Sequence, residues 1–209
     1  MAKGKSTIIK DTIILLIITI VSGFTLSAVN KVTKEPIAYA RTEEKNKAYK
    51  GMFNEAESFQ SNETLVQMCE SSKEFLKEKG FNGTTVNEAL IAKSNNEAIG
   101  YIINATSPNG YGGNVEISLG LDKEGKIQGF EILSISETVG LGMKAKDDEF
   151  KSQFAGKKVK EIKYTKSGAS KEDEINAISG ATITTSAVTE AVNSALVFAK
   201  ENILGKEAF

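Results

Sequence analysis

One uninterrupted apolar run near the N-terminus constrains this chain more than any other part of its sequence. The run from Thr12 to Val29 reads TIILLIITIVSGFTLSAV, and no charged side chain interrupts it. As a helix rising ~1.5 Å per residue, it spans close to the ~30 Å hydrocarbon core of a bilayer. We therefore predict a transmembrane anchor over residues 12–30, preceded by a short tail at residues 1–11.

A cleaved signal peptide is the alternative explanation of this run. The apolar core of a signal peptide is normally ~7–15 residues long and is followed by small residues at the cleavage site. The present run is longer, and the LSAVNK that closes it is a poor cleavage site. An uncleaved anchor is therefore the preferred interpretation.

The orientation of the anchor depends on the basic side chains that flank it. These are Lys3, Lys5 and Lys10 before the run and Lys31, Lys34 and Arg41 after it. Charge alone is nearly balanced, but a short basic tail favours a cytoplasmic N-terminus. We therefore expect a single-pass protein of the cell membrane whose main domain is extracytoplasmic.

The composition of the chain excludes several kinds of chemistry. There is no histidine and only one cysteine, Cys69. A disulfide within the chain, a zinc site of the usual type, an iron–sulfur cluster ligated within the chain and a c-type haem are all excluded. Redox chemistry in this chain would need an organic cofactor. With 26 basic and 27 acidic side chains, the chain shows no electrostatic sign of nucleic-acid binding.

The part of the chain that follows the anchor divides into a connector and a domain. Residues 31–42, which include Pro36, have the character of a connector. The domain is then expected over residues 43–209. Helical composition and spacing predict one helix at residues 43–59 and a second at residues 65–79.

The middle of the domain has sequence patterns that predict β-strands. An apolar run at residues 98–106 ends before Ser107-Pro108-Asn109-Gly110, which is typical of a turn. Residues 114–121 alternate, with Val115, Ile117, Leu119 and Leu121 on one side, and this predicts a strand with one buried face.

The next segments predict a hairpin. Asp122-Lys123-Glu124-Gly125 is a plausible turn, and residues 126–135 form the partner strand. The alternation slips near Gln128 and Gly129, which indicates a β-bulge. Residues 158–165 are a further strand candidate, before a polar loop at residues 166–174.

A helix is expected at the C-terminal end of the domain. Its apolar residues fall on one face: Val188, Ala191, Val192, Ala195, Leu196, Ala199 and Ile203. The order of helices, antiparallel strands and a final helix predicts an α+β fold, an antiparallel sheet with flanking helices.

The sequence Ser179-Gly180-Ala181-Thr182 stands immediately before this last helix. Small side chains permit close approach of a ligand to the backbone, and the helix N-terminus offers free N–H groups and a positive dipole end. A phosphate group is the natural ligand of such a site. Ser and Thr before a helix are also ordinary capping residues, and local sequence alone does not exclude that role.

This stretch resembles the flavinylation motif of the FMN-binding domain found in the G subunit of Rnf electron-transport complexes and the C subunit of Na⁺-translocating NADH:quinone reductases. In that family, FMN is joined by a phosphoester bond to the threonine of Ser/Thr-Gly-Ala-Thr, which implies Thr182 here. The family motif begins with an aspartate three residues before the Ser/Thr, where this sequence has Asn176.

The resemblance extends over residues 98–200 and the anchor. Gly110-Tyr111-Gly112-Gly113, Gly120-Leu121-Asp122 and residues 150–157 (FKSQFAGK) match family patterns. Ser136-Glu137-Thr138-Val139-Gly140-Leu141-Gly142 resembles the family's Glu-Thr-Pro-Gly-Leu-Gly loop, with Val139 in place of proline. The single anchor and the chain length are more similar to the Rnf protein than to its quinone-reductase relative.

The resemblance implies an electron-transfer subunit of a membrane-bound ferredoxin:NAD⁺ oxidoreductase complex that moves ions, with no complete activity alone. Its partners would be the other subunits and a Mg²⁺-dependent flavin transferase that uses FAD. The residues implied to contact FMN are Tyr111, Gly112, Gly113, Glu137, Thr138, Gly140, Leu141, Gly142, Ser179, Gly180, Ala181 and Thr182. Two alternatives remain open: a membrane-tethered sensory domain that holds FMN or another phosphate ligand reversibly, and a purely structural module.

Overall fold

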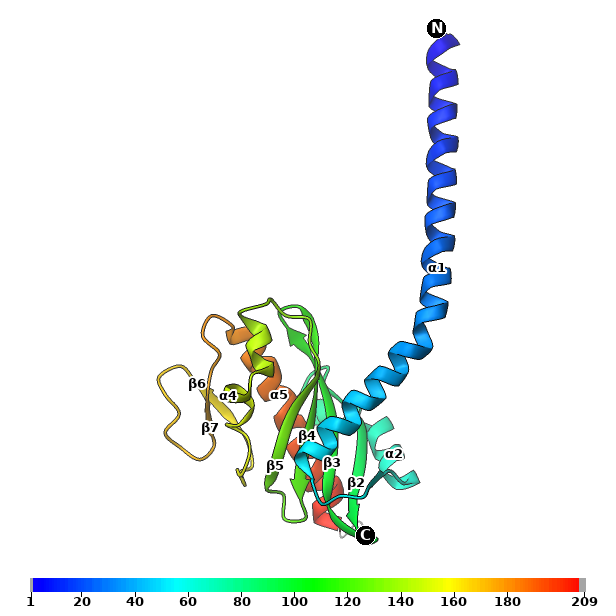
Figure 1. Ribbon diagram of the computed structural model, residues 1–209. Coiled ribbons are helices and arrows are strands. Elements are labelled where there is room, and N and C mark those ends of the chain that lie inside the picture. The colour runs from blue at the N-terminus through cyan, green and yellow to red at the C-terminus, as the bar shows by residue number, and fades with distance from the viewer. Residues whose placement is uncertain (1, 207–209) are drawn as a thin grey trace. The chain divides into compact units, whose positions relative to one another are not determined.

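The computed structural model describes residues 2–206 (Figure 1), and these form two compact units that divide between Glu44 and Lys45. The first unit consists of helix α1 (Ala2–Met52), whose last residues belong to the second unit. Over its most apolar window this helix has a mean hydropathy of 2.4, and it is long and apolar enough to cross a membrane. The connector expected at residues 31–42 is itself helical, with Pro36 inside α1.

The second unit is built on an antiparallel five-stranded sheet in which each strand lies beside its sequence neighbour. Its strands are β1 (Ser58–Gln60), β2 (Thr85–Ser94), β3 (Glu97–Gly110), β4 (Gly113–Asp122) and β5 (Ile127–Ser134). This arrangement, with helices on the sheet, confirms the α+β fold class predicted from the sequence. The strand at Thr85–Ser94 was not predicted.

Helices cover both faces of this sheet. Helix α5 (Thr182–Phe198) lies across one face, and the end of α1, residues 45–52, lies across the other (Figure 1). The alternating apolar residues of β4, from Val115 to Leu121, are completely buried in the core that contains α5. The predicted C-terminal helix and its apolar face are thus confirmed, and a π-helical turn at Ala199–Ile203 extends it.

The second face of the sheet is buried as well, which corrects the prediction of one buried face for β4. Ser118 is fully buried on that face, and Gly120 lies under α1. A Cβ built on Gly120 would lie 3.1 Å from the sulfur of Met52 and 3.2 Å from the ring of Phe53. Glycine in the central strands therefore makes room for the end of α1.

Polar contacts fix the end of α1 beside this apolar contact. The Tyr49 hydroxyl donates to a carboxylate oxygen of Glu88 at 3.2 Å and accepts a hydrogen bond from the Asn104 amide. Lys45 forms an ion pair with the same Glu88 oxygen at 3.2 Å. Burial is the main reason that the pKa of Tyr49 is raised, so the phenol stays protonated.

The two helices predicted in the first part of the domain have different boundaries in the structure. Helix α1 ends at Met52, and the segment predicted as a helix at residues 43–59 closes with strand β1. The segment predicted at residues 65–79 consists of two short helices, α2 (Glu63–Glu70) and α3 (Ser72–Glu78). The side chain of Asn62 caps the first of these, accepting from the Leu65 N–H at 2.8 Å.

The turns around β4 bear out one prediction and correct another. The carbonyl of Asp122 accepts from the Gly125 N–H at 3.1 Å, as predicted for a hairpin turn. The pairing of β4 with β5 shifts between Ile127 and Gly129, which confirms the β-bulge at Gln128. The turn expected at residues 107–110 instead lies beyond them, because β3 continues to Gly110 through an irregularity in its pairing.

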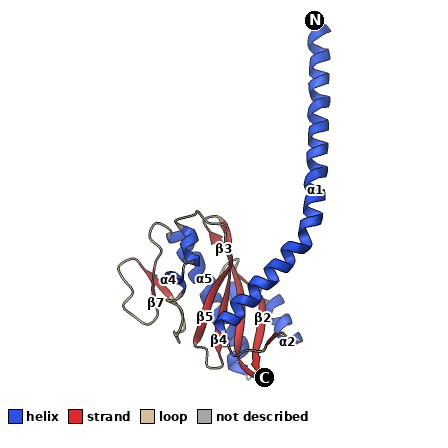
Figure 2. Cartoon of the chain, viewed as in Figure 1, coloured by secondary structure: helices blue, strands red, loops and turns tan. Residues whose placement is uncertain are grey.

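The segment between β5 and α5 is mostly loop (Figure 2). It contains the short 3₁₀ helix η1 (Gly142–Lys146), helix α4 (Asp148–Lys151) and two parallel strands, β6 (Lys163–Thr165) and β7 (Glu174–Asn176). The strand predicted at residues 158–165 is therefore reduced to its last residues. This loop-rich segment delivers residues 135–142 and 178–181 to the start of α5.

Candidate functional site

A cavity of about 350 Å³ lies at the N-terminal end of α5. Three chain segments line it: the turn between β3 and β4, the loop after β5, and the start of α5. Its lining residues are Tyr111, Glu137, Thr138, Leu141, Gly142, Gly180, Ala181, Thr182, Ile183 and Thr184. The volume falls within the range of ~300–1,000 Å³ that is usual for small-molecule sites.

Two tight turns of the same type form part of the wall. In the first, the Leu141 N–H donates to the Thr138 carbonyl at 3.1 Å, and Gly140 has φ +79°. In the second, the Ala181 N–H donates to the Ile178 carbonyl at 3.0 Å, and Gly180 has φ +76°. A positive φ at the third residue only defines a type II turn, and glycine is the residue that adopts it without strain.

Close packing joins the loop after β5 to its two neighbours. A Cβ on Gly142 would lie 2.7 Å from both the Glu137 carboxylate and the Thr184 hydroxyl. A Cβ on Gly112 would lie 1.8 Å from the Ser136 carbonyl oxygen, and the Gly112 N–H donates to Glu137 at 3.3 Å. Glycine is thus sterically required at positions 112 and 142, and the Glu137 carboxylate is fixed at the edge of the cavity.

The Glu190 carboxylate of α5 holds the β3–β4 turn from the other side. One of its oxygens accepts hydrogen bonds from the Ser107 hydroxyl at 2.6 Å and from the Asn109 amide at 2.8 Å. Both donors come from the last residues of β3, just before the turn that carries Tyr111. The turn is therefore attached to the same helix that presents Thr182.

Thr182 is the first residue of α5 and is partly buried. Ala181 occupies the N-cap position, and no side chain caps the helix. Within the described residues, the Thr182 hydroxyl has no hydrogen-bond partner, so neither it nor Ser179 performs the capping role considered from the sequence. The first N–H groups of the helix, together with its dipole, therefore remain available to an anion.

The cavity unites eight of the residues expected to contact a ligand: Tyr111, Glu137, Thr138, Leu141, Gly142, Gly180, Ala181 and Thr182. The expected residues Gly112, Gly113, Gly140 and Ser179 lie in the adjoining turns and do not line it. Sequence reasoning missed Ile183 and Thr184, which also line the cavity. Their position in the first turn of the helix, directly after Thr182, was the available signal.

Sequence reasoning also missed Thr185, which is completely buried. Its hydroxyl accepts a hydrogen bond from the Ile178 N–H at 3.0 Å and donates one to the Ala181 carbonyl at 2.9 Å. It thereby connects the two ends of the turn that precedes Thr182.

The two departures from the family pattern have clear structural positions. Val139 is the second residue of the type II turn at Thr138–Leu141, where proline is favoured but not required. The side-chain oxygen of Asn176 accepts from the Ala169 N–H at 2.7 Å, and an aspartate oxygen would accept in the same way. Asn176 therefore preserves the acceptor that organises this loop.

Apolar side chains are exposed at and beside the cavity. Tyr111 is 73% exposed, Val139 86%, Leu141 44% and Ile183 53%. Such a rim can contact the apolar surface of an aromatic ligand or of a partner protein.

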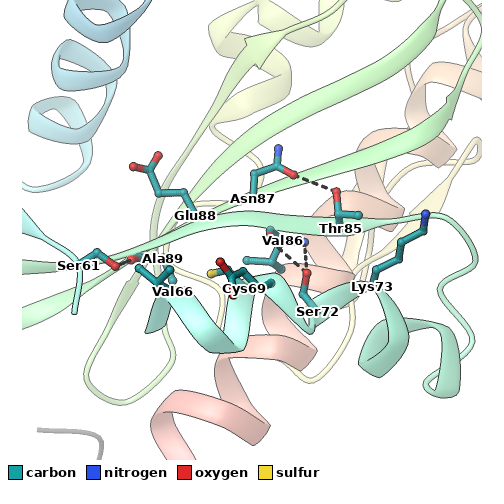
Figure 3. Close-up of a pocket in the computed structure, with 11 residues that line it drawn as sticks. Ser61, Val66, Cys69, Ser72, Lys73, Thr85, Val86, Asn87, Glu88 and Ala89 are labelled. Atoms are coloured by element: carbon teal, nitrogen blue, oxygen red, sulfur yellow. Dashed lines mark hydrogen bonds between the residues drawn. The ribbon is translucent and has the colours of Figure 1, made fainter. Parts of the chain in front are cut away.

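A second cavity, of about 530 Å³, lies between β2 and helices α2 and α3 (Figure 3). The Ser72 hydroxyl there accepts from the Val86 N–H at 3.1 Å and donates to the Val86 carbonyl at 3.2 Å, and Ser61 donates to the Ala89 carbonyl at 3.0 Å. These contacts satisfy the part of β2 that β1 does not pair, so the polar groups of this cavity protect a sheet edge.

Cys69 lines the second cavity, and its environment keeps the thiol unreactive. Burial is the larger cause, and the negative charge of Glu88 the smaller one, of a rise in the pKa of Cys69 to about 11. The thiol therefore stays protonated at neutral pH, whereas redox-active cysteines are thiolates.

Comparison with known proteins identifies the class of domain that carries the first cavity. The FMN-binding domain family matches residues 110–197, which include the β3–β4 turn, the loop after β5 and the start of α5. The chain is 31% identical over 93% of its length to the G subunit of the proton-translocating ferredoxin:NAD⁺ oxidoreductase complex of Clostridium ljungdahlii, and 92% of that protein is covered. The chain belongs to the family formed by the G subunits of ion-translocating oxidoreductase complexes.

Two further similarities cover about half of the chain. The G subunit of the Na⁺-translocating ferredoxin:NAD⁺ oxidoreductase complex of Acetobacterium woodii is 41% identical over 52% of this chain and 53% of its own length. The crystal structure of the C subunit of Na⁺-translocating NADH-quinone reductase from Parabacteroides distasonis is similar with a TM-score of 0.47 and 26% identity, over 53% of this chain and 59% of that one.

Proposed function

We propose that this chain is the FMN-carrying electron-transfer subunit of a membrane-bound ferredoxin:NAD⁺ oxidoreductase complex that moves ions, and that it holds FMN through a phosphoester to Thr182. The observation that carries the proposal is the Thr182 hydroxyl, which has no hydrogen-bond partner among the described residues and lies at the uncapped N-terminus of α5, in the lining of a cavity within the matched FMN-binding region. The relatives of this chain that are named as G subunits of such complexes support its role as a subunit of an ion-translocating oxidoreductase complex.

The residues at this site fit the chemical groups of FMN. The free N–H groups and positive dipole end of α5 suit a phosphodiester, which keeps one negative charge. The Glu137 carboxylate is the one charged group in the described lining, and it can accept hydrogen bonds from the flavin, while the Thr184 hydroxyl can accept or donate them. Gly142 leaves space between these two side chains, because a Cβ at this position would collide with both Glu137 and Thr184.

The proposed attachment is a group transfer from FAD and involves no redox change. The Thr182 hydroxyl oxygen forms a bond to the phosphorus of the FMN half of FAD. The P–O bond to the AMP half breaks, AMP leaves, and the hydroxyl proton passes to solvent. The family resemblance implies that a Mg²⁺-dependent flavin transferase would catalyse this step.

Bound FMN would supply one- or two-electron transfer, and the chain would supply its position and electrostatic environment. The single cysteine and the lack of histidine leave the chain without the usual ligands of a metal redox centre, so the electron donor and acceptor would belong to partner subunits. Attachment to a helix terminus would keep the flavin in place through repeated reduction and oxidation.

The apolar part of α1 would anchor the chain in the cell membrane, with the tail at residues 1–11 in the cytoplasm and the domain outside it. The basic tail supports this orientation. A covalent link would then keep the flavin from being lost outside the cell membrane.

In-gel flavin fluorescence after full denaturation tests the covalent link. The wild-type chain, isolated from membranes that contain the transferase, should retain fluorescence, and Thr182→Ala should lose it while Ser179→Ala keeps it. Flavin that washes out of the denatured wild-type chain would favour a reversible binding domain instead. A wild-type chain that never carries flavin would support a purely structural module.

A further inference from the structure

The buried hydroxyl of Thr185 occupies an unusual place in the turn before α5. It accepts from the Ile178 N–H at 3.0 Å and donates to the Ala181 carbonyl at 2.9 Å, which are groups at the first and last residues of the turn. The Ala181 carbonyl also accepts from the Thr185 N–H at 3.0 Å, as the first bond of the helix. One side chain therefore joins both ends of the turn to the first turn of α5.

The turn depends on this hydroxyl because its ends are buried. Ile178 and Ala181 are each 7% exposed, and Thr185 is 0% exposed. Without the hydroxyl, the Ile178 N–H would lose its partner in a place that water does not reach easily, which is unfavourable. The exposed residues between them, Ser179 and Gly180, make no comparable contact that would hold the turn.

Thr182 follows this turn directly, so the turn decides where its hydroxyl points. Gly180 has φ +76°, and a Cβ there would lie 3.1 Å from the Leu141 side chain, so the turn is also packed against the opposite wall. A rigid turn presents the Thr182 oxygen in one direction. A loose turn would lower the fraction of molecules in which the oxygen can reach phosphorus in line with the leaving group.

We propose that Thr185 is the positioning residue for flavin attachment: its hydroxyl bridges Ile178 and Ala181 and thereby presents the Thr182 oxygen to the flavin transferase. This inference rests on the proposed function, since it assumes that Thr182 is the attachment site. Thr185 does not line the cavity and acts through the turn alone.

The test compares three variants of the full chain in detergent, each incubated with FAD, Mg²⁺ and purified flavin transferase. Thr185→Val keeps the shape of the side chain and removes both hydrogen bonds. Thr185→Ser retains the hydroxyl. Thr189→Val is the matched control, because the Thr189 hydroxyl is also buried on α5 and donates only to the Thr185 carbonyl at 2.8 Å.

The readouts are the initial rate of covalent flavin incorporation at saturating transferase and FAD, and the melting temperature of each chain. We expect Thr185→Val to lower the rate about tenfold, as expected for the loss of two ordinary hydrogen bonds. Thr185→Ser should recover most of the rate, and Thr189→Val should leave it unchanged even where its melting temperature falls. A role in folding alone would instead make the rate follow the melting temperature across all three variants.

Equal rates for wild type and Thr185→Val would overturn the inference while leaving attachment at Thr182 intact. A wild-type chain without covalent flavin would overturn the proposed function and this inference with it. If Thr185→Val does not fold, Gly180→Ala disturbs the same turn at an exposed position through its positive φ. Gly180→Ala must then slow attachment even when the rate is measured well below its melting temperature, and a normal rate in this variant would contradict the inference.

Discussion

Gly142 offers a direct test of how tightly the cavity wall is built. In Gly142→Ala the new Cβ would lie 2.7 Å from the Cβ and a carboxylate oxygen of Glu137 and 2.7 Å from the hydroxyl of Thr184. Non-bonded carbon atoms prefer ~3.5–4.0 Å, so at least one neighbour must move by about 1 Å. Thr184 is 1% exposed on the rigid first turn of α5, so Glu137 or the loop backbone must give way.

Overpacking of this kind costs about 1–3 kcal/mol. For a chain of this size, such a loss in the free energy of unfolding lowers the melting temperature by roughly 2–12 °C. Because Glu137 and Thr184 line the cavity, their displacement should also lower flavin incorporation. Circular dichroism melting and in-gel fluorescence of the full chain in detergent measure the two effects.

Gly140→Asn is the control for general disturbance of the loop. A Cβ on Gly140 meets nothing within 4 Å, and asparagine tolerates the φ of +79° better than other residues do. This variant should remain close to wild type in both measurements. The reasoning is refuted if Gly142→Ala melts and incorporates flavin like wild type, or if Gly140→Asn is as defective as Gly142→Ala.

Four further predictions concern the rest of the domain. Tyr49→Phe removes the hydroxyl that bonds Asn104 and Glu88 and should lower the free energy of unfolding by about 1–2 kcal/mol in urea titrations. Folding raises the pKa of the Cys69 thiol from 9.0 to about 11. The protonated thiol therefore contributes stability that is complete below pH 9.0 and is lost as the pH rises to about 11. The difference in unfolding free energy between wild type and Cys69→Ala should change only between these two pH values. Val139→Pro should stabilise the chain by about 0.4–1 kcal/mol, because proline favours the second position of this turn, and an unchanged or lower urea midpoint would contradict that assignment. Glu190→Ala should speed amide hydrogen exchange in the β3–β4 turn by at least about tenfold, because two hydrogen bonds to a charged group are lost. Unchanged exchange rates would show that the turn is stable without Glu190.

The strongly patterned parts of the chain were predicted well. The alternation of residues 114–121 indicated β4, the Asp122–Gly125 turn indicated the hairpin, and the irregularity at Gln128 indicated the bulge. These signals are local, because alternation and turn residues reflect the immediate surroundings of each side chain. The helical face of α5 was visible for the same reason.

Strand β2 was not predicted because its sequence does not alternate between apolar and polar residues. Ala89, Leu90, Ile91 and Ala92 are all buried, since helices cover both faces of the sheet at this strand, so no alternation appears. The shift in its pairing with β3 after Val86 disturbs the pattern further. A short apolar run of this kind does not distinguish strand from helix.

The candidate site was predicted in part for a different reason. The residues that resemble a family motif were found, and eight of them line one cavity. The role of Thr185 was not visible, because it depends on hydrogen bonds to the backbone of Ile178 and Ala181 that only the folded turn creates. For the same reason, the sequence alone did not separate capping by Ser179 or Thr182 from a free hydroxyl.

The central claim is that Thr182 carries FMN, and the mass of one peptide tests it most directly. Tryptic cleavage after Lys171 and Lys200 releases residues 172–200, which contain Thr182. In chain purified from native membranes, this peptide should be heavier by one FMN less one water, with fragment ions that place the addition on Thr182. An unmodified peptide, or an addition on Ser179, Thr184 or Thr185, would contradict the account.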